Sequence, residues 1–203
     1  GGGPPPPPPP TCDPSATLKN YDLTNHPQID YWRLEKNFSI SNAPRQRIQI
    51  IANTTICGAD LYIFKTAGLT TGLAHFEIWD DSLTVQYGSD SFSVDATTLG
   101  TSINTPTPTS FTWGSNKPVL SAGNYWVVIQ DDNSITPATL EYVRWAASND
   151  TGYLTSAHDG AAVGAGGGAD LNQDYLFQLN TINDGAIPPP PPPPLNSCSN
   201  PIV

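Results

Sequence analysis

Basic residues are scarce in this chain of 203 residues, which has 8 Lys and Arg against 18 Asp and Glu and a formal net charge of −10. With so few cations, no basic surface can neutralise a run of phosphates, and nucleic acid is excluded as an expected partner. No apolar run reaches the 18 or so residues that a membrane-spanning helix needs, so no span is expected. Met is absent and no charged-then-apolar leader opens the sequence, which indicates a processed product or an excised segment.

Residues and motifs that carry catalysis are also scarce. Glu occurs only at positions 35, 77 and 141, and a glycosidase needs two facing carboxylates. Neither the Gly-x-Ser-x-Gly elbow of serine hydrolases, nor the His-Glu-x-x-His zinc motif, nor the phosphate-binding Gly-x-x-x-x-Gly-Lys loop is present. The three His residues, His26, His75 and His158, are scattered along the sequence. We therefore expect a protein that is not an enzyme and that has no cofactor, apart from a candidate Ca²⁺ site described below.

Proline, in contrast, is abundant and concentrated, because two uninterrupted heptads, Pro4–Pro10 and Pro188–Pro194, contain most of it. Oligoproline favours the polyproline II helix at about 3.1 Å per residue, so each heptad is predicted to be a stiff spacer roughly 22 Å long. Such a segment can also be the ligand of an aromatic-lined groove, but no flanking Arg or Lys is present to orient it. The predicted organisation is a spacer over residues 1–11, one domain over 12–187 and a second spacer over 188–194.

Both heptads lead within a few residues to a cysteine, Cys12 after the first and Cys198 after the second. This likeness suggests that residues 195–203 begin a second copy of a spacer-plus-domain unit. The alternative is a C-terminal tail with a coincidental cysteine.

Inside the predicted domain the apolar residues have a period of two. Alternation in the segments 47–50, 75–78 and 91–94 indicates half-buried strands, and the β-branched and aromatic runs at 60–64, 125–129, 140–145 and 175–179 indicate further strands. Turn-forming residues separate them, and no helical window is found. Many short strands with turn-rich connections predict an all-β fold, an antiparallel two-sheet sandwich of jelly-roll type. The Gly-rich stretch 156–170 is expected to be a flexible surface loop. The predicted core residues are Ile48, Ile50, Leu61, Ile63, Phe76, Ile78, Val127, Ile129, Phe177 and Leu179.

The order of these segments resembles that of β-sandwich modules repeated in large secreted or surface bacterial proteins. The segments that carry the resemblance are Ile48–Phe64, Ala74–Trp79, Leu120–Ile129, Tyr142–Trp145 and Asp174–Leu179. Within them, Leu120 to Trp126 fits the pattern Leu-x-Ala-Gly-x-Tyr-Trp that recurs in that group, whereas the cysteines depart from it. The resemblance implies an extracellular jelly-roll domain, often beside adhesion or carbohydrate-related regions, with no known catalysis.

The chain has an odd number of cysteines, so at least one has no partner within it. We favour a disulfide between Cys12 and Cys57, which would staple the N-terminal segment to an inner strand. Cys198 would then have the same role in the next copy. A Cys12–Cys198 bond and an intermolecular bond through Cys198 are the alternatives.

Two further sets of residues have candidate roles. Asn37, Asn53 and Asn149 each begin an N-glycosylation sequon, although Asn and Thr are common enough for chance matches. Asp170, Asn172 and Asp174 could supply oxygen ligands to Ca²⁺, but solvated turn acids are the simpler interpretation.

Tryptophan supplies a candidate binding surface. Trp113, Trp79 and Trp145 could stack on sugar rings if they are exposed, and Trp113, between Thr112 and Gly114, is expected to be the most exposed. Trp126 lies in an apolar run and is expected in the core.

The functional expectation is a non-catalytic structural module of a secreted, repeated or polymerised surface filament, whose partners are neighbouring copies of itself. The stiff Pro spacers favour this interpretation over a freely swinging binding module. The alternative is a carbohydrate-binding or adhesion module of a secreted multidomain protein, with a polysaccharide as its partner.

Overall fold

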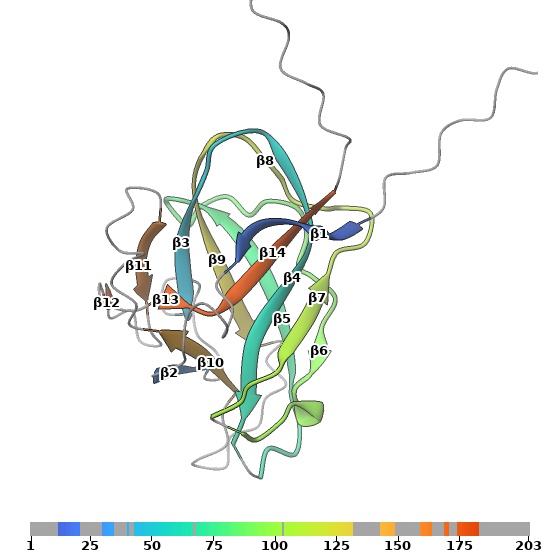
Figure 1. Cartoon of the computed structure of the whole chain (residues 1–203), viewed down its shortest axis with the longest axis vertical. Helices are drawn as coiled ribbons and strands as arrows, with labels where there is room; N and C mark the ends of the chain where they lie inside the picture. The colour runs from blue at the N-terminus through green and yellow to red at the C-terminus, as the bar shows by residue number, and fades with distance from the viewer. Residues whose placement is uncertain are drawn as a thin grey trace, which may run out of the picture.

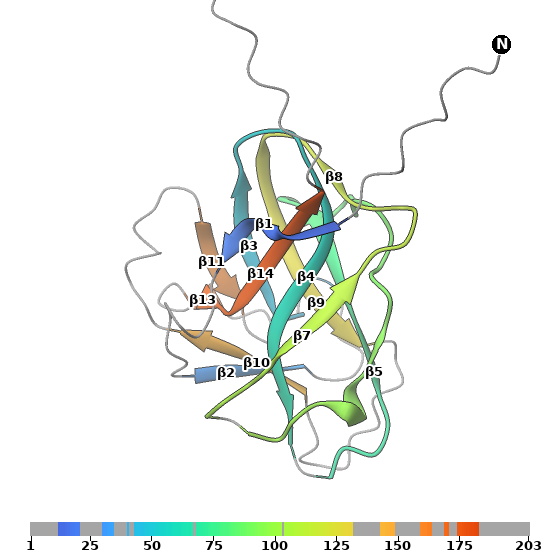
Figure 2. The same cartoon turned by 45° about the vertical axis from the view of Figure 1, so that its right-hand side comes forward.

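The computed structural model describes residues 12–20, 30–34, 40, 43–66, 68–102, 104–131, 143–148, 159–163, 169–170 and 174–182. These residues form two antiparallel β-sheets, which Figures 1 and 2 show from two sides. The predicted spacers and the segment 195–203 lie outside the described residues.

The first sheet has eight strands, five of them in the order β1-β14-β4-β10-β13, while β2 pairs with β10 and both β7 and β8 pair with β4. Its strands are β1 (Cys12–Asn20), β2 (Asp30–Leu34), β4 (Thr54–Lys65), β7 (Pro108–Thr112), β8 (Val119–Leu120), β10 (Val143–Ser148), β13 (Asp174–Tyr175) and β14 (Phe177–Ile182).

The second sheet has six strands in the order β12-β11-β3-β9-β5-β6. Its strands are β3 (Arg45–Ile50), β5 (Leu73–Asp80), β6 (Val94–Asp95), β9 (Gly123–Asp131), β11 (Asp159–Val163) and β12 (Ala169–Asp170). The two sheets pack face to face as a sandwich, which confirms the predicted all-β class.

The core lies between the sheets, and all ten predicted core residues are at most 1% exposed. Their phase follows the strand period, because alternate residues of each strand point to the same face. In β5, for example, Ala74, Phe76 and Ile78 point inward and are fully buried. Phe76 lies among aromatic rings of the opposite sheet and its connections, with ring centroids 6.1 Å from Phe111 and 6.4 Å from Trp145.

Cys12 is bonded to Cys57, with Cα atoms 5.5 Å apart, as in the favoured pairing. The bond lies beside the end of β14, because Cys57 Sγ is 3.5 Å from the Asn180 carbonyl oxygen. Cys12 itself pairs with Ile182 across the β1–β14 ladder. The first and last described residues of the sandwich are therefore neighbours in one sheet, and β1 and β14 lie side by side in both views (Figures 1 and 2).

Several local expectations were wrong. The stretch 156–170 is not a plain loop, because β11 and β12 lie in it and β11 pairs with β3. The segment 91–94 is not a full strand, since β6 contains only Val94 and Asp95.

Helical structure is minimal in the part of the chain described above: a 3-10 turn, η2 (Ala96–Thr98), precedes β7. No described helix is long and apolar enough to cross a membrane.

Candidate functional site

A polar cluster lies on the outer face of β5, in the second sheet. Since Phe76 and Ile78 point into the core, the alternate residues His75, Glu77 and Trp79 point to the other face of the sheet. The strand also carries a capped turn at its end, where Asp80 accepts hydrogen bonds from the backbone N–H groups of Thr84 (2.7 Å) and Val85 (2.8 Å).

After that turn, residues 86–91 run back along β5 and form what we call the return segment. The Tyr87 N–H donates to the Ile78 carbonyl (2.8 Å), and the Ser91 N–H donates to the Phe76 carbonyl (3.0 Å). This return segment closes the edge of the sheet and places Asp90 next to His75. His75 and Glu77 of β5 and Asp90 of the return segment therefore lie close together.

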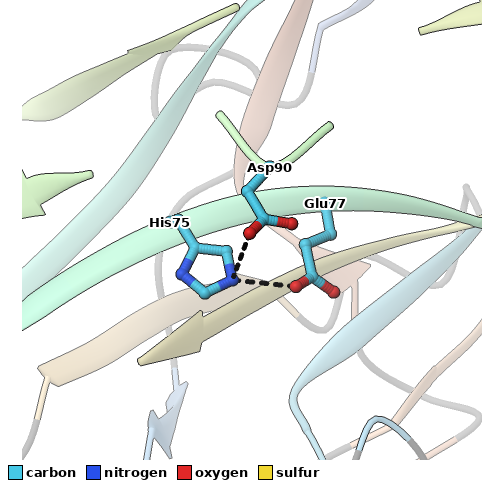
Figure 3. A group of neighbouring side chains, drawn as sticks. All are labelled: His75, Glu77 and Asp90. Carbon is cyan, nitrogen blue, oxygen red and sulfur yellow. Dashed lines mark hydrogen bonds and ion pairs between the residues drawn. The ribbon is translucent and has the colours of Figure 1, made fainter. Parts of the chain in front are cut away.

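Three side chains meet there: His75 Nε2 is 2.8 Å from Glu77 Oε1 and 4.0 Å from Asp90 Oδ2 (Figure 3). The His75 and Glu77 side chains are 12% and 7% exposed, whereas the Asp90 side chain is 54% exposed. The cluster thus has a buried floor formed by β5 and a solvent-facing side formed by the return segment.

The second carboxylate oxygen of Glu77 is held by two neighbours on the sheet. Trp79 Nε1 donates to Glu77 Oε2 at 2.6 Å, and Gln130 Nε2 of β9 donates to the same oxygen at 3.0 Å. Burial by itself raises the pKa of Glu77, but hydrogen bonds from His75, Trp79 and Gln130 and the charge of His75 outweigh burial and lower the pKa. Glu77 is therefore a buried carboxylate that stays ionised at neutral pH.

Asp90 is held in a similar way. Its Oδ1 accepts a hydrogen bond from Gln86 Nε2 at 2.6 Å, while its Oδ2 faces His75. In the part of the chain that the structure describes, His75, Glu77 and Asp90 form the group of His, Cys, Asp or Glu side chains that could share a cation, with ligand atoms within 4.8 Å of one another.

A row of large side chains crosses the same face next to the cluster. Trp79 of β5 is directly opposite Trp126 of β9, and Trp126 is directly opposite Arg47 of β3. Both indoles are half-buried. Arg47 makes a two-point ion pair with Asp81, with Nε–Oδ1 and Nη2–Oδ2 both at 2.7 Å. The Trp126 Nε1–H donates to the Asp81 carbonyl at 3.0 Å, so Asp81 ties the row together.

The other candidate sugar-stacking residues do not offer a ring face to solvent. Trp113 was expected to be exposed but is only 4% exposed, and its Nε1–H donates to the Ser89 carbonyl at 2.8 Å. Trp145 is 1% exposed and stacks on Tyr175 with ring centroids 4.2 Å apart. Trp126, expected in the core, instead lies on the outer face, because it follows the opposite phase from Tyr125 and Val127.

Of the proposed Ca²⁺ ligands, the structure describes the side chain of Asp174. Asp174 is buried in β13, where its Oδ1 accepts a hydrogen bond from Gln46 Nε2 at 2.9 Å. Gln46 Oε1 in turn accepts the Tyr175 N–H at 3.1 Å, so Asp174 takes part in a contact between the two sheets. Asn172 and the side chain of Asp170 lie outside the described residues.

One predicted sequon asparagine can be placed. Asn53 is exposed in the turn between β3 and β4, where a glycan would extend into solvent. Asn37 and Asn149 lie outside the described residues.

Sequence reasoning noticed only part of the cluster. The alternation at 75–78 placed His75 and Glu77 on one face, and this i, i+2 spacing was the available signal. Asp90 could not be joined to them, because its position depends on the return of the chain along β5.

No protein-family model and no curated protein sequence matches this chain.

Proposed function

We propose that this chain is a non-catalytic structural module of a secreted, repeated or polymerised extracellular filament, a sandwich of jelly-roll type carried between polyproline II spacers. The observation that supports this most is the pairing of Cys12 with Ile182, next to the Cys12–Cys57 disulfide. The neighbours in the filament are further copies of the module.

The positions of Cys12 and Ile182 determine how the domain could be attached to the spacers of a filament. Residues 12 and 182 are opposite each other in adjacent antiparallel strands, so the chain enters and leaves the sandwich at one place. A spacer before residue 12 and another after residue 182 would therefore meet at this place. In this arrangement the domain is attached to the filament at one point, which leaves the rest of its surface to contact neighbouring copies.

The disulfide suits this role and suggests the compartment. Disulfides persist in oxidising environments, so a secreted or cell-surface location is favoured. The net charge of −10 would also keep pendant domains apart and the filament soluble.

Electron microscopy of native material tests the proposal directly. We expect filaments with one globular domain per repeat, attached on one side of a thin string. Dispersed single domains in native material, with no filament at any concentration, would contradict the proposal.

A second candidate function, saccharide binding or adhesion, is favoured by the row formed by Trp79, Trp126 and Arg47. Two half-buried indoles on adjacent strands, beside carboxylates and an arginine, combine ring faces with hydrogen-bonding groups, as sugar recognition requires. Against it, the Arg45 guanidinium lies 5.0 Å from the Trp126 ring centroid and covers part of that indole.

Affinity electrophoresis in gels containing soluble polysaccharides distinguishes the two functions. If the row binds sugar, Trp79→Ala and Trp126→Ala should each abolish the retardation of the wild-type domain. Phe92→Ala is the matched control, since Phe92 is an exposed aromatic outside this row. No retardation of the wild type in any gel would leave the filament role as the function of the module.

A further inference from the structure

We propose that His75, Glu77 and Asp90 form a binding site for a divalent transition-metal cation of the Zn²⁺ class. The ligand atoms would be His75 Nε2, Glu77 Oε1 and Asp90 Oδ2, on the outer face of the second sheet (Figure 3). This site does not rest on the filament role, and it borders the saccharide row through the Trp79–Glu77 hydrogen bond.

The donor atoms determine the class of metal. One imidazole nitrogen and two carboxylate oxygens match the mixed nitrogen and oxygen ligands that Zn²⁺ takes, commonly as three protein ligands with a further position open to water. Ca²⁺ and Mg²⁺ take oxygen ligands almost throughout, so an imidazole at the centre of the cluster selects against them.

The surroundings of the two carboxylates support the proposal independently of the three ligands. Each carboxylate has one oxygen held by N–H donors outside the cluster: Glu77 Oε2 by Trp79 and Gln130, and Asp90 Oδ1 by Gln86. The remaining oxygen of each carboxylate faces His75 Nε2. Outer hydrogen bonds of this kind orient ligating groups in metal sites and tune their affinity for the ion.

The distances fit an ion after a small adjustment. Ligand atoms about 2.0 to 2.1 Å from Zn²⁺ in a tetrahedron lie roughly 3.3 Å from one another. The separations of His75 Nε2 from Glu77 Oε1 and Asp90 Oδ2, 2.8 and 4.0 Å, lie on either side of this value. Since Asp90 is exposed and sits on the return segment, its side chain can move inward by the small distance required.

The three ligands differ in their exposure to solvent. The His75 and Glu77 side chains are largely buried on β5, while the Asp90 side chain borders solvent. The open side would leave room for water or another small ligand to complete the coordination. In the site, the metal would replace the hydrogen bond between His75 Nε2 and Glu77 Oε1.

Isothermal titration calorimetry of the whole chain with ZnCl₂ alone tests the site. The wild type should bind one Zn²⁺ at micromolar concentrations and should show no heat with CaCl₂ at the same concentrations. His75→Gln should abolish this binding, and Asp90→Asn should weaken it at least tenfold. Gln130→Ala, which removes an outer hydrogen bond, should weaken it about 10- to 100-fold.

Asp81→Asn is the matched control, because it removes the same charge from the turn just before the return segment without touching the three ligands. Its Zn²⁺ affinity should equal that of the wild type. Because Asp90 is exposed, the Asp90→Asn variant should fold normally even if variants of the buried ligands His75 and Glu77 do not fold.

Cu²⁺ provides a spectroscopic readout that a purely structural cluster would not produce. Bound Cu²⁺ should show nitrogen hyperfine coupling in electron paramagnetic resonance, and His75→Gln should remove it. The proposal is overturned if the wild type binds no Zn²⁺, if Asp90→Asn binds it as tightly as the wild type, or if the nitrogen signal persists in His75→Gln.

Discussion

The Phe76 ring packs against three other aromatic rings of the core. Its ring lies within 5.8 to 6.4 Å, centroid to centroid, of the rings of Trp113, Phe111 and Trp145. Phe76→Ala would lose this packing and leave a cavity, and we expect it to lower the free energy of unfolding by about 3 to 5 kcal/mol. Urea denaturation followed by tryptophan fluorescence measures the change.

Phe92 provides the control for this experiment, because it is the same residue type but 64% exposed. Phe92→Ala should change the free energy of unfolding by less than about 0.5 kcal/mol. Similar effects for the two substitutions would show that the sandwich does not pack around Phe76.

Asp80 is expected to give the turn after β5 a pH dependence. Hydrogen bonds from Ser82 and from the backbone of Val85 and Thr84 hold the pKa of Asp80 well below its ordinary value of 3.8. Because the pKa is lower in the folded turn than in the unfolded chain, Asp80 stabilises the turn above the ordinary pKa. This contribution is lost as the pH falls toward the folded pKa.

Amide hydrogen exchange at Thr84 and Val85 reports this effect. Protection at both amides should decline below about pH 4 in the wild type, after correction for intrinsic rates. Asp80→Asn should show weaker protection and little pH dependence across that range. Unchanged wild-type protection down to pH 2 would require another cap for the turn.

The tryptophans show how far single residues can be placed from sequence. The apolar run around Trp126 indicated burial, but the strand period puts Tyr125 and Val127 inside and Trp126 outside. Trp113 follows β7 in a turn-like context that suggested exposure, yet its ring packs on Phe76. Composition alone could not assign either face, because the phase of each strand is set by the opposite sheet.

At the scale of elements, the return segment along β5 depends on Gly88. Its φ is +76°, and an added Cβ would lie 2.8 Å from Pro118 N and 2.9 Å from Asn116 O. Gly88→Ala would therefore push the segment away from the 116–118 connection and strain the backbone. Since Asp90 is only two residues further on, the substitution should displace Asp90 from His75.

We expect Gly88→Ala to lower the free energy of unfolding by about 1 to 3 kcal/mol, measured by urea denaturation. It should also weaken Zn²⁺ binding in calorimetry, although it alters none of the three ligands. Gly100→Ala is the control, since an added Cβ there meets no atom within 4 Å. Full stability of Gly88→Ala would show that the segment can shift without cost.

The Cys12–Cys57 bond closes a loop of 45 residues that contains β2 and β3. In the chain-entropy model such a bond stabilises a fold by about 3 to 4 kcal/mol. The double variant Cys12→Ala, Cys57→Ala should be less stable by about this amount in urea denaturation. Equal stability with and without the bond would mean that β1 is held entirely by its ladder with β14.

The strands differ in how strongly their own amino-acid sequence predicts them. Strands that contribute alternating or continuous apolar residues to the core, such as β3, β5 and β9, were predictable from period two. β1 is an edge strand and β11 lies between β3 and the short edge strand β12. Most residues of Cys12–Asn20 and Asp159–Val163 are polar or small, so these segments carried no alternating apolar pattern. Their pairing with β14 and β3 is a long-range property that local sequence does not encode.

For the whole molecule, the net charge would govern how copies approach one another in the proposed filament. A net charge of −10 should keep copies apart at low ionic strength, and divalent cations should screen and bridge them. We expect the filaments proposed above to bundle in millimolar CaCl₂ and to separate again with EDTA, as measured by light scattering. Asp90→Asn should bundle like the wild type, because bundling would draw on the total surface charge rather than on one site.

The neighbouring positions of Cys12 and Ile182 also determine how the molecule would carry mechanical load. Tension applied through the two ends would pass from Cys12 across the disulfide to β4 and back through β14, without crossing the rest of the sandwich. The Cys12–Cys57 disulfide lies beside Asn180, near the end of β14, so it would join the two loaded strands covalently. The cluster on the second sheet lies outside this path, so it would keep its geometry under tension.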